Sequence, residues 1–378
     1  MRVVSLAPFR IAPPTTGGQR LIYDGARRLA LDCSAFLCLA VTTLRDRRPP
    51  PATPFRYQEL RAASSLLLAF ERARWLPKIP YLWSLRGYTA HLARMVLRER
   101  PDVVEAHFPW LMPVRRRLPP PIRVVLLMQN VESLWYEPFL RRRVGERLFR
   151  ALLLRLEAEG LALADHVVCL TEHDRRELMQ RHGLAPERVS VIPPGYFAAP
   201  SPAAAPTGRR NRALYVGSGF SDDGAAARRL LDVVVPRLDP GMSLVIAGNV
   251  CRKLRGCALP PAVECVGFVS DLDALMRDCR ALLNPDRLAT GINMKVIGAL
   301  GAGIPVISTP EGARGYEDLV GGPIRVGALE EFPALLRNAA PLSAAEREAV
   351  GRYEWKEIGA RRLALYRDLC AGSTGTPG

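Results

Sequence analysis

Short apolar runs alternate with longer amphipathic stretches along the whole chain. Apolar runs of about four to eight residues, when helical patterns separate them, are typical of buried strands in parallel β-α-β units. The first half of the chain therefore predicts an α/β domain built on a parallel sheet. Its expected strands are residues 2–7, 35–43, 102–106, 124–128, 166–170 and 189–192, and its expected helices include residues 20–31, 81–100 and 141–164.

A proline-rich break interrupts this pattern. It starts at Pro193-Pro194-Gly195 and continues through the Ala- and Pro-rich residues 198–207, a composition typical of linkers. A chain of 378 residues is long enough for two domains. We expect residues 1–195 and 196–354 to form two doubly wound domains that face a central cleft, and residues 355–378 to form a helix that returns to the first domain. The second domain's expected strands are residues 213–216, 243–247, 263–266, 281–284, 305–308 and 324–326, with a helix at 225–235.

The positive charge is concentrated in the first part of the chain. The net charge is +16, and residues 1–160 carry 27 Lys and Arg against 13 Asp and Glu, a net charge of +14. Such asymmetry suits a nucleic acid, an anionic membrane or a phosphorylated substrate. Arginine-rich codon usage is an alternative explanation for the excess of Arg over Lys, but it does not explain the asymmetry. Because no nucleic-acid-binding motif accompanies the charge, we do not expect a nucleic-acid partner.

Other features exclude several classes of protein. No apolar run approaches the ~20 residues of a membrane-spanning helix, and no secretory apolar region follows Met1. The eight cysteines show neither C-x-x-C pairs nor the spacing of a zinc site. We therefore expect a cytoplasmic protein without a metal or another cofactor.

A candidate phosphate site follows the expected strand at residues 281–284. A helix N-terminus that offers free N–H groups beside a lysine is suited to bind a diphosphate. Asp286 or Thr290 could cap this helix. The segment lacks P-loop spacing, so an ordinary strand-to-helix turn is the alternative. The residues concerned are Thr290, Gly291, Ile292, Asn293, Met294 and Lys295, with Gly298 one turn further along the helix.

A second candidate lies after the first strand. Gly17 and Gly18 form a turn that could bring backbone N–H groups to a ligand at the carboxyl end of the sheet. A plain strand-to-helix turn would have the same sequence.

Nine segments, in the same order along the chain, resemble those of family 4 glycosyltransferases with the GT-B architecture. Each segment alone is a modest signal, but the ordered set is specific. They are PPTTGG (13–18), RPDVVE (100–105), QNVE (129–132), ADHVVCLTE (164–172), VIPPG (191–195), YVGS (215–218), VIAG (245–248), VGFVSDL (266–272) and residues 291–309.

The resemblance implies retaining transfer of a hexose from a nucleotide sugar, UDP- or GDP-linked, to a glycan, lipid-linked or small-molecule acceptor. The second domain would hold the donor, and the first would hold the acceptor. Lys295, the helix that it opens and the Gly17-Gly18 turn would stabilise the leaving diphosphate without a metal. Gly217 and Ser218, in the YVGS segment, would also contact the donor.

Three positions depart from the family pattern. The family usually has two glutamates eight positions apart, where this chain has Thr290 and Gly298. The Arg and Lys that often follow the first strand of the nucleotide domain are absent from Gly217-Ser218-Gly219-Phe220. Gln129 replaces a histidine that faces the cleft, and an amide cannot act as a titrating base. A degenerate GT-B protein that serves as a non-catalytic partner or sugar-binding subunit is therefore the alternative.

Two further side chains are candidates for the catalytic site. Glu132 could contact the sugar or the acceptor, or it could cap a helix. His107, at the end of an expected strand, could face the cleft, whereas the other histidines fit structural positions.

The aromatic and basic residues of the first domain suggest a membrane contact. Apolar side chains mixed with cations suit peripheral attachment to an anionic membrane, here the inner face of the cytoplasmic membrane. A buried aromatic core under a solvated basic face is the alternative. The tryptophans are Trp75, Trp83, Trp110 and Trp135, and the neighbouring cations include Arg72, Arg74, Lys78, Arg86, Arg94, Arg98 and residues 115–117.

Overall fold

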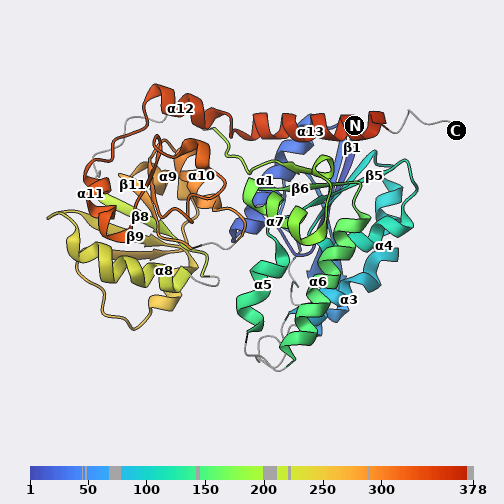
Figure 1. The fold of residues 1–378 in the computed structure, drawn as a ribbon, viewed down its shortest axis with the longest axis horizontal. Coiled ribbons are helices and arrows are strands. Elements are labelled where there is room, and N and C mark those ends of the chain that lie inside the picture. The colour runs from blue at the N-terminus through green and yellow to red at the C-terminus, as the bar shows by residue number, and fades with distance from the viewer. Residues whose placement is uncertain are drawn as a thin grey trace. The chain divides into compact units, whose positions relative to one another are not determined.

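The chain folds into two compact units. The computed structural model describes residues 1–44, 46, 49–67, 78–141, 145–198, 211–219, 223–287 and 290–372. Unit 1 comprises Met1–Pro14, Gly18–Pro193 and Ile358–Gly378, and unit 2 comprises Thr15–Gly17 and Pro194–Glu357. Figure 1 shows the elements of both units.

Unit 1 is built on a parallel sheet. In the part of the chain that the structure describes, its seven strands lie in the order β3-β2-β1-β4-β5-β6-β7. All neighbouring strands are parallel, so the α/β prediction is confirmed. The strands are β1 (Arg2–Ala7), β2 (Ala35–Thr43), β3 (Arg56–Ala62), β4 (Val103–His107), β5 (Arg123–Leu127), β6 (His166–Cys169) and β7 (Val189–Val191). The helices are α1 (Gly17–Asp32), α3 (Ile79–Ser84), α4 (Thr89–Arg98), α5 (Glu132–Leu140), α6 (Glu146–Leu163) and α7 (Glu172–His182).

Unit 2 repeats the same winding. Its six described strands are also parallel, in the order β10-β9-β8-β11-β12-β13. They are β8 (Arg212–Val216), β9 (Ser243–Ala247), β10 (Val263–Gly267), β11 (Ala281–Asn284), β12 (Val306–Ser308) and β13 (Ile324–Val326). The helices are α8 (Asp223–Arg229), α9 (Leu272–Arg277), α10 (Met294–Gly301), α11 (Phe332–Arg337) and α12 (Ala344–Gly351), followed by α13 (Trp355–Ala371).

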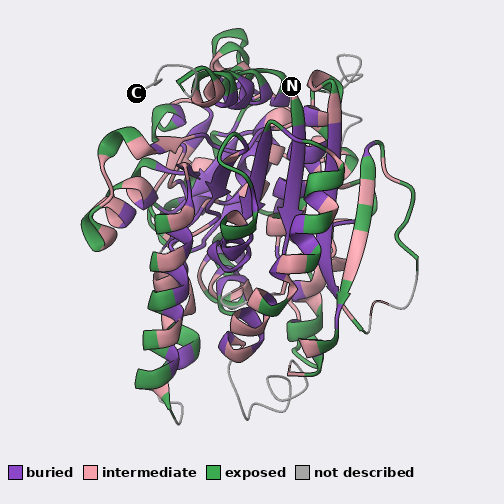
Figure 2. Cartoon of the chain, turned by 90° about the vertical axis from the view of Figure 1, so that its right-hand side faces the viewer, coloured by how far each residue is buried: buried purple, intermediate pink, exposed green. Residues whose placement is uncertain are grey.

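Burial explains why the strands form where the apolar runs occur. Strands β1, β2 and β4 are buried along nearly their whole length, as Figure 2 shows for the centre of the sheet. Side chains that are apolar on both faces are expected where helices cover both sides of a parallel sheet. The edge strand β3 differs, because its exposed and half-buried positions alternate.

The helix expected over residues 81–100 is wrong as a single element. It is divided into α3, a 3-10 helix at Leu85–Tyr88, and α4. The Ser84 hydroxyl donates to the carbonyl of Tyr81, and the Thr89 hydroxyl donates to the carbonyl of Arg86 at 2.9 Å. Hydroxyl groups that bond to the preceding turn, together with Gly87 between them, weaken a continuous helix.

The helix α13 packs onto unit 1 from Ile358 onward. Arg362 pairs with Glu105 of β4 at 2.6 Å, and the Tyr366 hydroxyl donates to the same carboxylate at 2.5 Å. Burial raises the pKa of Glu105, but Arg362, His107 and Tyr366 together outweigh it and hold this pKa at about 2. A buried ion pair therefore fixes the C-terminal helix to the central strand.

The tryptophans do not share one surface. Trp110 is buried and stacks on Phe108 with ring centroids 4.9 Å apart, so its expected place beside surface cations is wrong. Trp83 is half-buried, with the guanidinium groups of Arg86 and Arg155 over its ring at 4.4 and 5.6 Å. Trp75, Arg72 and Arg74 lie outside the described residues. None of the described helices combines the length and apolar character needed to cross a bilayer.

Candidate active site

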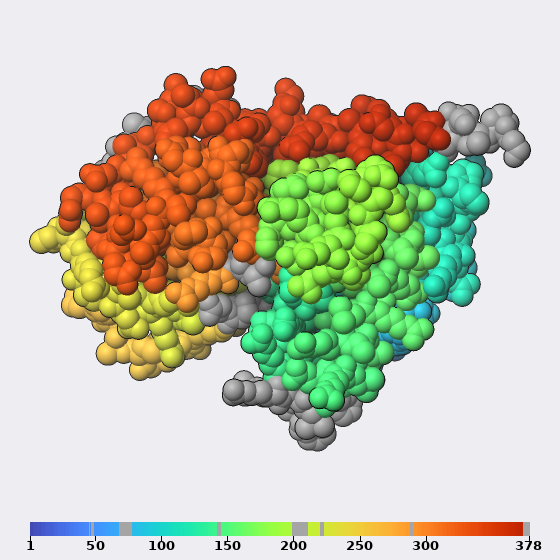
Figure 3. Space-filling view, viewed as in Figure 1, coloured from blue at the N-terminus to red at the C-terminus, as the bar shows by residue number. Residues whose placement is uncertain are grey.

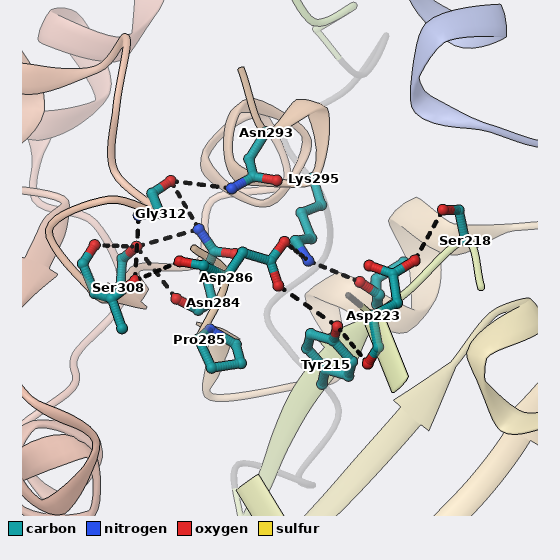
Figure 4. Close-up of polar contacts among 12 residues, drawn as sticks. Tyr215, Ser218, Asp223, Asn284, Pro285, Asp286, Asn293, Lys295, Ser308 and Gly312 are labelled. Carbon is teal, nitrogen blue, oxygen red and sulfur yellow. Dashed lines mark hydrogen bonds and ion pairs between the residues drawn. The ribbon is translucent and has the colours of Figure 1, made fainter. Parts of the chain in front are cut away.

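The strand order of unit 2 reverses between β8 and β11, which lie side by side. In open α/β sheets, ligands bind at the carboxyl ends of the strands at this point. The chain that leaves β8 carries Gly217 and Ser218, and the chain that leaves β11 leads through Asp286 to α10. Several of the residues expected to bind the donor, among them Ser218, Asn293 and Lys295, therefore lie at the switch point of this sheet (Figure 4).

Lys295, in the first turn of α10, points back to both strands. Its Nζ lies 2.6 Å from Oδ2 of Asp286 and donates to the carbonyl of Val216 at 3.0 Å. The same ammonium lies 4.7 Å from the ring centroid of Tyr215. The side chains of Lys295 and Asp286 are each 11% exposed. The lysine that the sequence singles out therefore belongs to a largely buried ion pair.

The helix cap expected from Asp286 or Thr290 is wrong. Asn293 occupies the N-cap position of α10 and makes no capping bond with its side chain. Its amide donates instead to the carbonyl of Gly312 at 3.2 Å. The Asp286 carboxylate is directed to Lys295, and Thr290 is buried. Asp286 thus forms an ion pair with Lys295 instead of capping the helix.

Hydrogen bonds fix the backbone that carries Asp286. The Thr309 hydroxyl donates to the Asp286 carbonyl at 2.7 Å. The Asn284 amide donates to Ser308 Oγ at 3.1 Å and to the Gly312 carbonyl at 2.9 Å, while its own Oδ1 is buried without a partner in the described structure. A Cβ on Gly312 would lie 2.6 Å from Ser308 Oγ. Hydrogen bonds from Thr309 and Asn284 thus hold the carbonyls of Asp286 and Gly312 in place.

A carboxylate also organises the turn after β8. Asp223, the first residue of α8, accepts from the Ser218 hydroxyl at 2.9 Å and from the Gly219 backbone N–H at 2.8 Å. A Cβ on Gly217 would lie 2.8 Å from Cβ of Val250, so the close packing there requires glycine. Sequence reasoning missed Asp223, although an acidic residue in the first turn of a helix is a recognisable signal.

The remaining predicted donor residues line the start of α10. Gly291 has a φ of +79°, a conformation that favours glycine. Ile292 packs against the core, and Met294 is half-buried. Gly298 lies one turn beyond Lys295, and a Cβ there would meet only the side chain of Met276, at 3.7 Å. The position where the family usually has a glutamate therefore has room for a side chain.

In unit 1, the structure brings Gly18 and Gln129 together. The Gln129 amide donates to the Gly18 carbonyl at 3.3 Å, and a Cβ on Gly18 would lie 2.6 Å from Gln129 Oε1. Gly18 lies in the first turn of α1, and Gln129 follows β5, so both stand near the carboxyl edge of the sheet. Gly17 is the first residue of α1 and belongs to the short segment Thr15–Gly17 of unit 2.

Glu132 begins α5 and is buried. Burial, and next the neighbouring carboxylate of Glu157, raise its pKa well above the ordinary value. One of its oxygens, Oε1, is buried without a hydrogen-bond partner among the described residues. Glu157 itself accepts from the Ser133 N–H and hydroxyl, both at 2.8 Å. Burial and Glu157 thus favour the protonated form of Glu132 over its carboxylate.

His107 is placed in the buried cluster under α13. Its Nε2 lies 3.6 Å from Oε1 of Glu105, the residue that binds Arg362. Burial lowers the pKa of His107, and Arg362 lowers it further, against the opposing effect of Glu105. Burial thus favours the neutral imidazole, and His107 contacts the carboxylate that binds Arg362 of α13. No group of three or more His, Cys, Asp or Glu side chains in the described ranges could hold a metal ion.

Two family models match the chain. The family model for Glycosyltransferase Family 4 matches residues 16–196, and the model for Glycosyl transferases group 1 matches residues 210–337. A comparison with curated proteins finds no match.

Several solved structures share the fold. The sucrose-phosphate synthase of Thermosynechococcus elongatus has a TM-score of 0.72 at 14% identity, over 98% of this chain and all of that one. HepE of Anabaena, in complex with UDP and glucose, has a TM-score of 0.68 at 14% identity, over 97% of this chain and all of that one. The lipopolysaccharide outer core galactosyltransferase WaaB has a TM-score of 0.61 at 14% identity, over 99% and 100% of the two chains. The architecture is GT-B, and the chain belongs to the family 4, group 1 glycosyltransferases.

Proposed function

We propose that the protein transfers a hexose, with retention of configuration, from a UDP- or GDP-sugar held by unit 2 to a glycan, lipid-linked or small-molecule acceptor held by unit 1. The observation that carries this proposal is Lys295 in the first turn of α10, at the switch point between β8 and β11. The complex of HepE with UDP and glucose supports the choice of donor class.

The chemistry requires stabilisation of a leaving diphosphate. The first backbone N–H groups of a helix have no partner within the helix and favour an anion. Lys295 adds a cation beside them, and the negative charge on the diphosphate grows as the glycosidic bond breaks. The acceptor hydroxyl attacks on the face from which the diphosphate leaves, so the configuration is retained. We propose that no metal takes part, and turnover that EDTA abolishes would contradict this.

The alternative is a degenerate protein that binds a sugar or a partner without turnover. Two observations favour it: Thr290 and Gly298 supply no carboxylate, and Lys295 already has a carboxylate partner in Asp286. Gln129 can hydrogen-bond a sugar hydroxyl but cannot take its proton near neutral pH.

Nucleotide binding combined with product analysis separates the two functions. We expect UDP or GDP to raise the melting temperature, and the matching nucleotide sugar to be consumed. Lys295→Ala should abolish consumption, whereas Lys356→Ala, which removes an exposed lysine from α13, should not. Stabilisation by a nucleotide sugar without any consumption would favour the degenerate binder, and no response to any nucleotide would contradict a donor site.

We further propose that unit 1 contacts an anionic membrane through the outer face of α6. Leu148 and Leu154 are 61% and 39% exposed there, and Arg147, Arg150 and Arg155 are exposed on the same helix. Figure 3 shows α6, in green, at the surface of its unit. Apolar side chains among arginines suit insertion at the interface of an anionic bilayer.

Co-sedimentation with vesicles tests this surface. Binding to vesicles with anionic lipid should weaken with salt and with the Leu148→Ser/Leu154→Ser double variant. Leu31→Ser is the matched control, because Leu31 is 69% exposed on α1. Equal binding by all three proteins would show that the α6 face is not the contact.

A further inference from the structure

We propose that Asp286 is a positioning residue that competes with the donor's diphosphate for Lys295 and so limits donor affinity. The inference rests on the proposed function of unit 2 as the donor site. It concerns the contacts of the ammonium group shown in Figure 4.

The three N–H donors of Lys295 each face a partner. An ammonium group has three donors and no acceptor. Nζ lies 2.6 Å from Oδ2 of Asp286, donates to the Val216 carbonyl at 3.0 Å and sits over the ring of Tyr215 at 4.7 Å. A phosphate oxygen that binds Nζ directly must therefore displace one of these partners.

Two of the partners are fixed by the fold. Val216 is the last residue of β8 and pairs with Ala247 of β9. The Val216 carbonyl is therefore part of a strand held within the sheet. Tyr215 is completely buried in the core of unit 2, and its hydroxyl donates to the carbonyl of Asp223 at 3.3 Å. Displacing either group would disturb the central strand.

Asp286 is the partner that can move. Its backbone is held by the hydroxyl of Thr309, and the preceding carbonyl of Pro285 accepts from Arg229 at 3.1 Å. Its carboxylate is attached to the backbone through rotatable bonds. Among the described residues, its second oxygen, Oδ1, accepts one long hydrogen bond, of 3.5 Å, from the Tyr215 hydroxyl. Rotation of this side chain frees Lys295 without disturbing the sheet.

The charges of Lys295 and Asp286 also indicate that Asp286 weakens the binding of a diphosphate. Lys295 and Asp286 are largely buried, so their interaction is screened less than that of an exposed pair. Together they are neutral, and a diphosphate placed against Nζ would also lie close to the carboxylate. Whether Asp286 turns away or stays, its charge opposes the binding of the diphosphate.

Asp286→Asn tests the competition, because the amide keeps the shape of the side chain and removes its charge. Isothermal titration with UDP and with GDP should give a Kd lower by about tenfold or more than that of the wild-type protein. The gain should shrink at high salt. Asp239→Asn is the matched control: it removes the same charge from an exposed ion pair with Arg337 and should leave the Kd within about twofold.

A double variant shows whether the effect acts through Lys295. Asp286→Asn added to Lys295→Met should lower the Kd much less than it does in the wild-type background, because no cation remains for which the carboxylate competes and only its direct repulsion of the diphosphate is removed. A structural role alone would not tighten binding, and Asp286→Ser provides the same comparison if the Asn variant does not fold. An unchanged or higher Kd in the folded Asp286 variants, with the wild type binding UDP or GDP, would overturn the inference alone. Absence of binding by every protein would overturn the proposed function and this inference with it.

Discussion

Replacing Arg362 with Met would remove the cation that neutralises Glu105 inside unit 1. The two side chains are 7% and 1% exposed and are joined at 2.6 Å. Methionine fills a similar volume but leaves the carboxylate buried and uncompensated. Loss of one partner of a buried pair costs about 3–5 kcal/mol.

The pKa of Glu105 gives a second estimate of the stability that the buried ion pair contributes. Burial raises that pKa, yet Arg362 and the other partners hold it at about 2, against an ordinary value of 4.5. At about 1.4 kcal/mol per pKa unit, this difference corresponds to about 3 kcal/mol of stability. Because the folded-state pKa is the lower one, this stabilisation is complete above about pH 4.5 and is lost as the pH falls toward 2.

Urea unfolding followed by tryptophan fluorescence measures the effect. Arg362→Met should lower the free energy of unfolding by about 3 kcal/mol at pH 7. The deficit should shrink toward pH 4, because Glu105 in the variant is protonated more readily than in the wild type. Glu105→Gln added to Arg362→Met should recover most of the loss, and Arg367→Met, at an exposed position of α13, should have little effect. A loss below about 1 kcal/mol, or a double variant no more stable than Arg362→Met, would refute the reasoning.

Two glycines give further predictions. A Cβ on Gly160 of α6 would lie 2.6 Å from Cα and 2.8 Å from O of Pro109, so Gly160→Ala should lower the free energy of unfolding in urea by about 3 kcal/mol. Gly351→Ala is the control and should be neutral, because a Cβ there would have no described atom within 4 Å. Equal stabilities of the two variants would contradict this prediction. Gly298→Glu should leave the melting temperature unchanged, since Met276 Cε is 3.7 Å from the new Cβ, and should lower the Kd for UDP or GDP by restoring the carboxylate usual in the family. Weaker nucleotide binding by the folded Gly298→Glu variant would show that a carboxylate at this position does not help to hold the nucleotide.

The sequence predicts those strands whose burial requires a continuous run of apolar residues. β2, β9, β11 and β13 begin and end where the apolar runs do. β3 was missed because an edge strand with half its positions exposed lacks a continuous apolar run. The separate helix α5 was missed because the apolar pattern before residue 141 did not mark its start.

A candidate site could be predicted from the sequence, but the contacts of its residues could not. Lys295 stands out because it opens a helix after a strand. Its contacts with Val216 and Asp286 depend on β8 and β11 being neighbours, which the order of the strands along the chain does not reveal. The pairing of Gly18 with Gln129 likewise arises only when the sheet of unit 1 is assembled.

The anomeric configuration of the released sugar distinguishes transfer with retention from transfer with inversion. Proton NMR can identify the first-formed anomer when the protein transfers or hydrolyses the hexose of an α-linked UDP- or GDP-sugar. We expect an α-configured product from the wild-type protein and none above background from Lys295→Ala. A β-configured product, or equal turnover by the two proteins, would contradict this expectation.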